Sequence, residues 1–382
     1  MIHLEDRAKL NERIAAAVSG EKQLLQELLE DVRPLKSRVH QIQPRATTAI
    51  SFVATDGGNA RLHFDPFLVQ LVRVVDSSDN EYWMDTVTAS ADLRALSKQQ
   101  FDNAGAAHNP LGRMMKQLGV RTLSELSHMI RTDNRGRPVS PSWVQVYREL
   151  VEWAVLLSIV QTKNFGTDTL LVVDGLLRTK VFSGDLFERY LELLHQTIEH
   201  HRTRERRKIF IVGVAKKSKV LARYRLPLAM ERVMATNYPA FVEIPRELEA
   251  KAYTWAEFAR GADVSAAGGE GVKFVGGKMY FVKFGSRARD PIWPVDVLLA
   301  QESEVETILG HLLSDAQNGF PIPFYPRCLQ KAHENAALVD FDLDVLQDGV
   351  FEALRSLVED ASVLDTFRFL DNDPAQERYG SR

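Results

Sequence analysis

The chain has 382 residues, of which 45% are hydrophobic and 26% are charged. This is the composition of an ordinary folded protein, which excludes global disorder, and the length allows one large domain with insertions or two domains. Lysine and arginine number 48 against 51 aspartates and glutamates, so the formal net charge is -3. This balance excludes a whole-molecule attraction to nucleic acid, and any such binding must use a local basic surface.

The single cysteine, Cys328, excludes an internal disulfide and a cysteine-rich zinc site. A lone cysteine is typical of proteins in a reducing compartment. The first residues lack the basic and apolar parts of a signal peptide, and no apolar run approaches the length of a membrane span. We therefore expect a cytoplasmic protein with no membrane association.

Residues 1–40 predict an N-terminal helical arm. Apolar residues recur there at spacings of three, four or seven, with charges between them. They are Leu10, Ile14, Val18, Leu25, Leu28, Val32 and Leu35. Such a stripe is typical either of a docking or dimerisation helix or of an arm that packs on its own domain, and the sequence leaves both open.

Residues 41–365 predict one mixed α/β domain. An apolar run at 48–55, the tetrapeptide Asp56-Gly57-Gly58-Asn59 and a second run at 60–64 predict a β-hairpin. The segments 67–75 and 82–87 predict further antiparallel strands. Residues from about 91 to 140 read as a helical insertion.

The middle of the chain alternates between helices and strands, as neighbouring strands of one sheet do. Its predicted elements are a helix at 142–161, a buried strand at 169–173, a helix at 184–206, a strand at 208–214 and a helix at 218–234. A loop-rich insertion at about 245–277 and a strand at 278–284 follow, and then helices at 302–316, 327–339 and 345–358. Residues 366–382 form a polar tail.

Two aspartates follow apolar runs that are far apart in the sequence. Asp56 stands in a turn pattern, where Asp-Gly is common for structural reasons, and Asp174 stands where a buried strand ends. If the two strands are neighbours, the carboxylates converge and can hold the pair of divalent cations that phosphodiester hydrolysis uses. The pair therefore indicates a candidate metal site.

Four segments in one order resemble the NurA nuclease family. They are Phe52-Val-Ala-Thr-Asp56-Gly-Gly, Leu170-Leu-Val-Val-Asp174-Gly-Leu-Leu, Ile211-Val-Gly-Val-Ala-Lys216, and Gly319-Phe-Pro-Ile-Pro with Ala332-His333-Glu334. They span roughly residues 46–337. The family commonly has serine after each Asp-Gly, where this chain has Gly58 and Leu176.

The resemblance implies an RNase H-like mixed sheet flanked by helices, with the arm and the insertions added. It implies a homodimer that cleaves DNA with Mn²⁺ or Mg²⁺, through two ions, as a single-strand endonuclease and a 5′–3′ exonuclease. It also implies partnership with a HerA-like hexameric ATPase that translocates DNA, in end processing or in defence.

Carried over residue by residue, the resemblance assigns Asp56, Asp174 and His333 to the metal centre. It also implies a glutamate on the helix before Asp174. The sequence offers two, of which Glu152 fits the family's apolar context better, with Glu149 as the alternative.

Basic residues near the strand ends are candidates for contact with DNA. Lys216 is a catalytic candidate that would bring positive charge to the scissile phosphate, and Lys217 is its competitor. The other substrate-channel candidates are Arg178, Lys180, Arg223 and Arg225, together with Lys217.

The leading hypothesis is therefore a metal-dependent deoxyribonuclease. The alternative is a catalytically weak dimeric adaptor that docks on a translocase and guides DNA without cutting it. A nuclease with the same core that acts on RNA or in defence is a third possibility, because such scaffolds host many functions.

Overall fold

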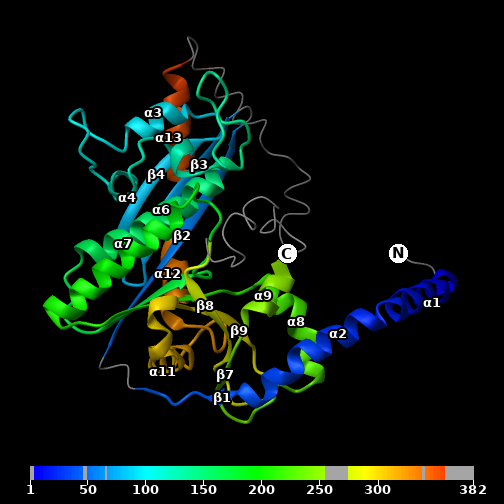
Figure 1. Cartoon of the computed structure of the whole chain (residues 1–382). Helices are drawn as coiled ribbons and strands as arrows, with labels where there is room; N and C mark the ends of the chain where they lie inside the picture. Colours follow the sequence, from blue (N-terminus) through cyan, green and yellow to red (C-terminus); the bar gives the residue numbers. More distant parts are fainter. Residues whose placement is uncertain (1–3, 46–49, 65–66, 254–273, 338–339, 358–382) are drawn as a thin grey trace.

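The computed structural model describes residues 4–45, 50–64, 67–253, 274–337 and 340–357. Within these residues, nine strands form one sheet in the order β1-β7-β8-β9-β6-β5-β2-β3-β4 (Figure 1). The strands are β1 (His40–Gln41), β2 (Ser51–Phe64), β3 (Phe67–Asp76), β4 (Glu81–Thr88), β5 (Thr169–Asp174), β6 (Ile209–Val214), β7 (Ala240–Glu243), β8 (Gly277–Lys283) and β9 (Trp293–Leu298).

Five of these strands form the part of the sheet that matters for the site. β2, β3 and β4 make an antiparallel meander, β5 pairs parallel to β2, and β6 pairs parallel to β5. Helix α6 (Trp143–Thr162) lies in the connection from β4 to β5, and α7 (Leu186–His200) in the connection from β5 to β6. A three-stranded meander followed by two parallel strands is the RNase H-like arrangement, so the predicted mixed α/β fold class is confirmed.

The remaining helices flank the sheet or join its strands. They are α1 (Leu4–Gly20), α2 (Lys22–Val32), η1 (Arg33–Arg38), α3 (Leu93–Lys98), α4 (Pro110–Leu118), α5 (Leu123–Leu126), η3 (His201–Glu205), α8 (Lys219–Met230), α9 (Arg246–Tyr253), η4 (Leu299–Glu304), α11 (Val305–Ala316), α12 (Arg327–Ala336) and α13 (Asp340–Arg355). None of the helices that the structure describes is long and apolar enough to cross a lipid bilayer.

The two faces of the sheet bury different helices, because successive residues of a strand point to opposite faces. Leu171 of β5 packs in a cluster with residues of α6 and α7, whereas Leu170 and Val172 pack with residues of α11 and α12. Helix α6 lies between the sheet and helices α4 and α7, so it is apolar around most of its surface. The sheet is therefore covered on both faces around β5.

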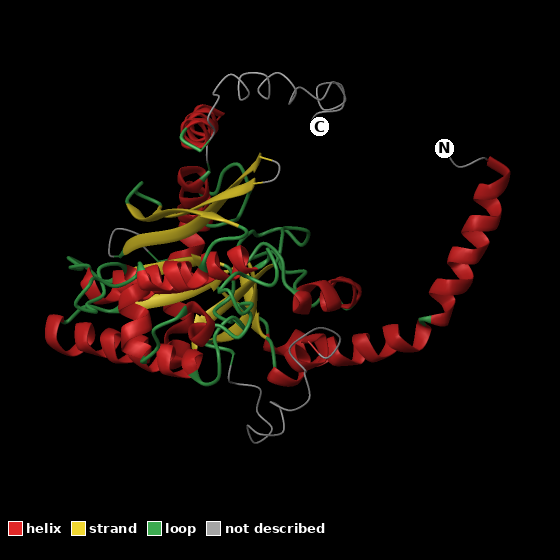
Figure 2. Ribbon diagram, turned by 90° about the horizontal axis from the view of Figure 1, so that it is seen from above, coloured by secondary structure: helices red, strands yellow, loops and turns green. Residues whose placement is uncertain are grey.

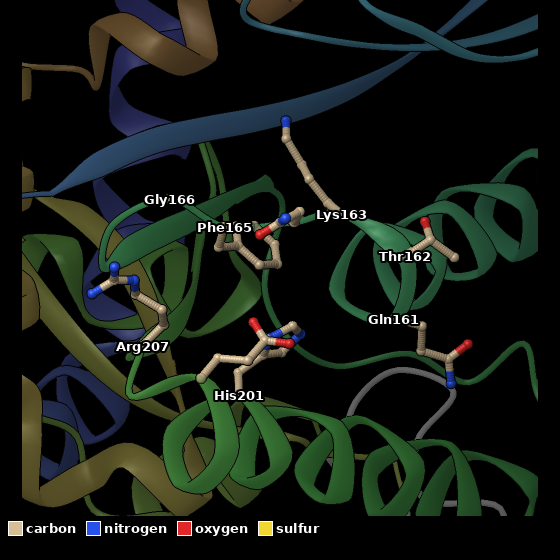
Figure 3. A pocket seen from close by; sticks show the side chains of 9 residues that line it. Gln161, Thr162, Lys163, Phe165, Gly166, His201 and Arg207 are labelled. Atoms are coloured by element: carbon tan, nitrogen blue, oxygen red, sulfur yellow. The ribbon is translucent and has the colours of Figure 1, made fainter.

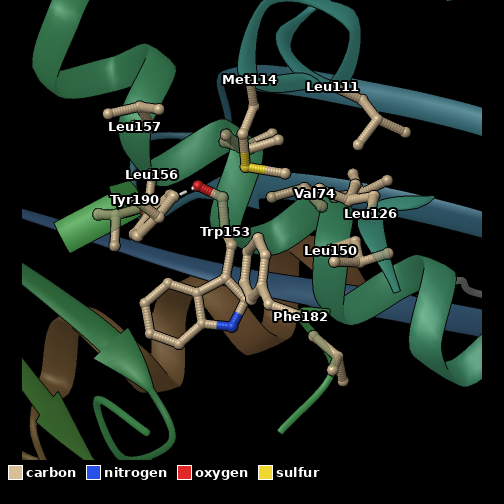
Figure 4. Packing of buried hydrophobic residues seen from close by; sticks show 14 of the residues in the cluster. Val74, Leu111, Met114, Leu126, Leu150, Trp153, Leu156, Leu157, Phe182 and Tyr190 are labelled. Atoms are coloured by element: carbon tan, nitrogen blue, oxygen red, sulfur yellow. Dashed lines mark hydrogen bonds between the residues drawn. The ribbon is translucent and has the colours of Figure 1, made fainter. Parts of the chain in front are cut away.

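Trp153 is central to the packing of α6 (Figure 4). Its ring lies edge-on to those of Phe187 and Tyr190, with centroids 5.3 and 5.5 Å away. The Tyr190 hydroxyl donates to the Trp153 carbonyl at 2.9 Å, which satisfies a buried polar group. These contacts fix α6 against α7.

The N-terminal arm is helical, as predicted. Figures 1 and 2 show α1 extending away from the rest of the chain, while α2 contacts α8. Leu10, Ile14 and Val18 of α1 are 38, 51 and 66% exposed. The apolar stripe of α1 therefore does not pack on its own domain within the described residues.

The predicted hairpin at 48–64 is wrong. β2 runs without interruption from Ser51 to Phe64, and its residues 55–64 pair with β3 along their whole length. The sequence Asp56-Gly57-Gly58-Asn59 therefore lies inside a strand. Pairing with β3 provides hydrogen-bond partners for the backbone groups of this segment, and this outweighs the local preference of its residues for a turn.

Strands β1, β7 and β9 and helix α9 were not predicted. β7 is short, and β9 contains Pro294, which usually argues against a strand interior. Pro294 lies at the second position of β9, before the pairing with β6 begins at Val295, and its carbonyl accepts the Ala215 N–H at 3.1 Å. In the predicted loop-rich insertion, residues 246–253 form α9, and residues 254–273 lie outside the described residues.

The chain turns sharply after β5 and crosses β6 at Gly213. A Cβ atom at Gly213 would lie 2.4 Å from the Gly175 carbonyl oxygen and 3.0 Å from the Leu177 nitrogen. The Gly175 N–H also donates to the Val214 carbonyl at 3.0 Å. Only glycine lets the residues that follow Asp174 approach β6 this closely.

We predict that Gly213→Ala lowers the free energy of unfolding by about 1–3 kcal/mol, because backbone must move to admit the methyl group. Urea unfolding measures the change. Gly166→Ala is the matched control, since no atom lies within 4 Å of the added Cβ. Equal midpoints for both variants and the parent protein would contradict the prediction.

Candidate metal centre

The pairing of β2 with β5 brings the two predicted aspartates together at the level of the backbone. Thr55 pairs with Val173 in the parallel register, so Asp56 and Asp174 occupy the next position on two neighbouring strands. Neighbouring strands lie about 4.8 Å apart. β5 ends at Asp174, whereas β2 continues, and the side chain of Asp56 lies outside the described residues.

Both carboxylate oxygens of Asp174 have partners. Oδ2 lies 3.3 Å from the Lys216 ammonium nitrogen, and Oδ1 accepts the Tyr325 hydroxyl at 3.0 Å. The Asp174 side chain is 20% exposed, so it is reachable from solvent. Asp174 is therefore held in one orientation and already interacts with one positive charge.

Lys216 follows β6 and also lies over the Tyr325 ring, with Nζ 5.6 Å from the centroid. Its side chain is 37% exposed. Its neighbour Lys217 is exposed. The contact of Lys216 with Asp174 favours Lys216 over Lys217 for an electrostatic role at this carboxylate.

Tyr325 was not singled out from the sequence. It is fully buried, and its ring packs against Trp293 with centroids 4.9 Å apart. In the sequence it stands between Pro323 and Pro326, which reads as a loop. The only indication of its role is chemical: the hydroxyl of a buried tyrosine usually has a hydrogen-bond partner.

The two glutamates of α6 differ in their environments. Glu149 is half-buried, and it accepts a hydrogen bond from the hydroxyl of Thr179, in the segment that follows Asp174. Burial raises the pKa of Glu149 above its ordinary value. Glu152, the favoured candidate, is 30% exposed and pairs with Arg148 at 3.2 Å. Glu149 thus contacts the segment that follows Asp174, and both glutamates remain candidates.

His333 lies on α12, which packs against β2, β3 and β5. The helix is fixed there by Asn335, whose side-chain amide donates to the Asp76 carbonyl at 3.0 Å and whose own carbonyl accepts from Arg73 at 2.8 Å. His333 is exposed. It therefore sits on the helix that covers the strands of both aspartates.

Among the side chains that the structure describes, no three His, Cys, Asp or Glu residues are close enough together to hold a metal ion. The side chain of Asp56 is not among these described side chains. At the candidate centre, the structure shows the side chain of Asp174 in contact with Lys216 and Tyr325.

The structure places Arg178 away from the predicted substrate surface. Its guanidinium binds both oxygens of Asp296, at 2.6 and 2.8 Å, and Glu249 at 2.6 Å, and its side chain is 5% exposed. Burial opposes the charged form, but the two carboxylates prevail and raise the pKa of Arg178. Arg178 therefore anchors the segment after Asp174 to β9.

The other predicted DNA contacts are more accessible. Lys217 and Arg225 are exposed, and Lys180 is half-buried. Arg223 is half-buried and lies over the Tyr224 ring, 5.8 Å from its centroid.

A cavity of about 570 Å³ lies at the opposite end of β5, near its first residue (Figure 3). It is lined by Gln161, Thr162, Lys163, Asn164, Phe165, Gly166, His201, Glu205 and Arg207. His201 is held there by the Val160 carbonyl at 2.7 Å and by Glu205 at 2.8 Å. This cavity is separate from the candidate metal centre.

No protein-family model matches the chain, and no curated protein sequence matches it. The chain is similar over nearly its whole length to solved NurA structures. The NurA nuclease from Sulfolobus solfataricus is 12% identical with a TM-score of 0.45, over 94% of this chain and 99% of that chain. NurA bound to dAMP and manganese is 10% identical with a TM-score of 0.44, over the same shares.

We predict that Arg178→Gln lowers the free energy of unfolding by about 3–5 kcal/mol, because it leaves Asp296 buried without the cation that binds it and leaves Glu249 with Arg246 alone. Chemical denaturation measures the loss. Arg202→Gln is the control, since Arg202 pairs with Glu199 while 62% exposed, and such a pair contributes about 1 kcal/mol or less. Comparable losses in the two variants would show that the cluster is not a structural anchor.

Proposed function

We propose that the chain is a divalent-metal-dependent deoxyribonuclease. The observation that carries the proposal is the parallel register of β2 and β5, which sets Asp56 beside Asp174. The motif resemblance to NurA nucleases supports the same assignment. By that resemblance, the protein acts as a homodimer with a HerA-like hexameric ATPase, cutting single strands internally and degrading DNA from 5′ ends, in end processing or defence.

The donor set at the centre fits a hard divalent cation such as Mn²⁺ or Mg²⁺. Carboxylate oxygens are suitable ligands, and Asp174 already attracts the positive charge of Lys216. Asp56 and Asp174 would hold the ions with a glutamate of α6, Glu152 or Glu149, and with His333. Bound there, two cations would activate water and stabilise the leaving oxygen.

The chain's own residues have distinct roles around that centre. Tyr325 donates to Oδ1 of Asp174 and so fixes the direction of its other oxygen. Lys216 brings positive charge to the scissile phosphate. Where His333 is protonated and so does not bind a metal ion, it can instead donate a proton to the departing oxygen. Lys180, Lys217, Arg223 and Arg225 are the proposed contacts to the DNA backbone, and Arg178 supports the loop from inside.

A second candidate function rests on the arm. The exposed stripe Leu10, Ile14 and Val18 on the projecting helix α1 favours an adaptor that docks on a translocase and guides DNA without cutting it. DNA binding without metal-dependent cleavage by the full chain would support this candidate over the nuclease.

We predict that Asp174→Asn and Asp56→Asn each reduce DNA cleavage by at least about 100-fold, because each removes a charged metal ligand worth several kcal/mol in the transition state. End-labelled single-stranded DNA with Mn²⁺ gives the rates, with a chelator as the blank. Asp79→Asn is the control, since Asp79 is exposed in a left-handed turn that asparagine also accepts. Cleavage that survives both substitutions would refute the nuclease assignment.

We predict that Tyr325→Phe weakens Mn²⁺ binding about 10-fold, because a hydrogen bond to a charged carboxylate is lost. Isothermal titration measures the affinity. Tyr190→Phe removes a hydroxyl of similar burial that donates to the Trp153 carbonyl, and it should leave Mn²⁺ affinity unchanged. Equal affinities for both variants would remove Tyr325 from the centre.

A further inference from the structure

The segment between α11 and α12 exposes a large aromatic side chain. Phe320 is 82% exposed. A single exposed apolar residue is common on protein surfaces and by itself indicates no function. The conformation of the loop that carries Phe320, and its attachment to the candidate metal centre, indicate a function for this residue.

The ends of the loop meet closely. A Cβ atom at Gly319 would lie 2.2 Å from the Tyr325 carbonyl oxygen. Gln330 of α12, which is 5% exposed, accepts the Ile322 N–H at 2.7 Å and donates to the carbonyls of Ile322 and Tyr325 at 3.0 and 2.9 Å. The loop is therefore closed and held by a buried amide.

Two other apolar residues of the loop, Ile322 and Phe324, face inwards. Ile322 and Phe324 are partly buried against the core cluster that contains Tyr325, and Phe324 accepts a φ of 56° to do so. A non-glycine residue with a positive φ indicates that contacts with the surrounding structure fix its backbone conformation. Phe320 is thus left outside on a loop with a defined conformation.

The same loop ends on the candidate metal centre. Tyr325 closes the loop and donates its hydroxyl to Asp174 at 3.0 Å. Phe320 is therefore coupled to Asp174 through a short, rigid path of five residues. A group bound by Phe320 would have a fixed position relative to Asp174.

Exposed cations follow the loop on α12. Arg327 and Lys331 are both exposed and stand four residues apart, so they share one side of the helix, with the exposed Glu334 three residues further on. Aromatic side chains next to cations are the combination by which proteins hold single-stranded nucleic acid, because bases stack while phosphates meet positive charge.

We propose that Phe320 stacks on an unpaired base of single-stranded DNA and so positions the strand at the centre of Asp56 and Asp174. This inference rests on the proposed nuclease function and assigns to Phe320 the contact that makes the site prefer unpaired strands. In duplex DNA the faces of the bases are already stacked on one another, so Phe320 acts only on single strands. Arg327 and Lys331 contact the phosphates beside that base.

The test measures KM and kcat of the full chain with Mn²⁺ on single-stranded and duplex DNA. We expect Phe320→Ala and Phe320→Leu to raise KM for single strands about 5- to 100-fold, in line with the contribution of one stacked base, with kcat little changed. Phe320→Trp and Phe320→Tyr should restore the affinity, because they keep an aromatic face. KM for duplex DNA should not change.

Val139→Ala is the matched control, because Val139 is a 66% exposed apolar residue elsewhere in a loop. Loss of affinity in the alanine variant that leucine restores would overturn the inference, because leucine keeps an apolar contact but no stacking face. Wild-type KM in all four Phe320 variants would overturn the inference while leaving the nuclease function in place.

If the parent protein does not cleave DNA, the proposed function fails separately. Fluorescence anisotropy with a labelled oligothymidylate then decides the inference. Stacking predicts that Phe320→Ala binds this strand about 5- to 100-fold more weakly than the parent protein. Equal binding by the two, or no binding by either, would overturn it.

Discussion

The candidate site depends on the parallel pairing of β2 with β5. Five residues of β2 pair with β5 in a register that ends at Thr55 and Val173. A shift of one residue would move every side chain of β5 to the opposite face and separate Asp56 from Asp174. The register is held because Leu171 must face α6 while Leu170 and Val172 face α11 and α12. The core on both faces of the sheet thereby sets the position of the carboxylates.

Segments with strong periodic patterns were predictable from the sequence. The buried strand before Asp174, the strand at Ile209–Val214 and helix α6 appear where their apolar runs indicate. The conformation of Asp56-Gly57-Gly58-Asn59 could not be predicted from the sequence. These four residues are typical of a turn, but the structure places them inside a strand. Only the ladder with β3 decides between them.

The site side chains show the same limit. α6 is apolar on several sides, so its periodicity could not tell which of Glu149 and Glu152 faces the Asp174 segment. The fate of Arg178 depends on Asp296, which is 118 residues away in the sequence. No sequence motif marks Tyr325 as a site residue, because its role depends on a contact with Asp174, which is 151 residues away in the sequence. Contacts of this range are fixed by topology and leave no local trace.

The buried cluster of Arg178, Asp296 and Glu249 has a consequence for how this sequence can vary. Losing Arg178 would leave the buried Asp296 without the cation that binds it, and losing both carboxylates would leave Arg178 charged inside the domain without an anion. Related chains should therefore keep all three residues or replace them together with apolar ones. Covariation among these three positions would persist even in descendants that had lost the aspartates of the metal centre, so it would record the architecture of the domain independently of its chemistry.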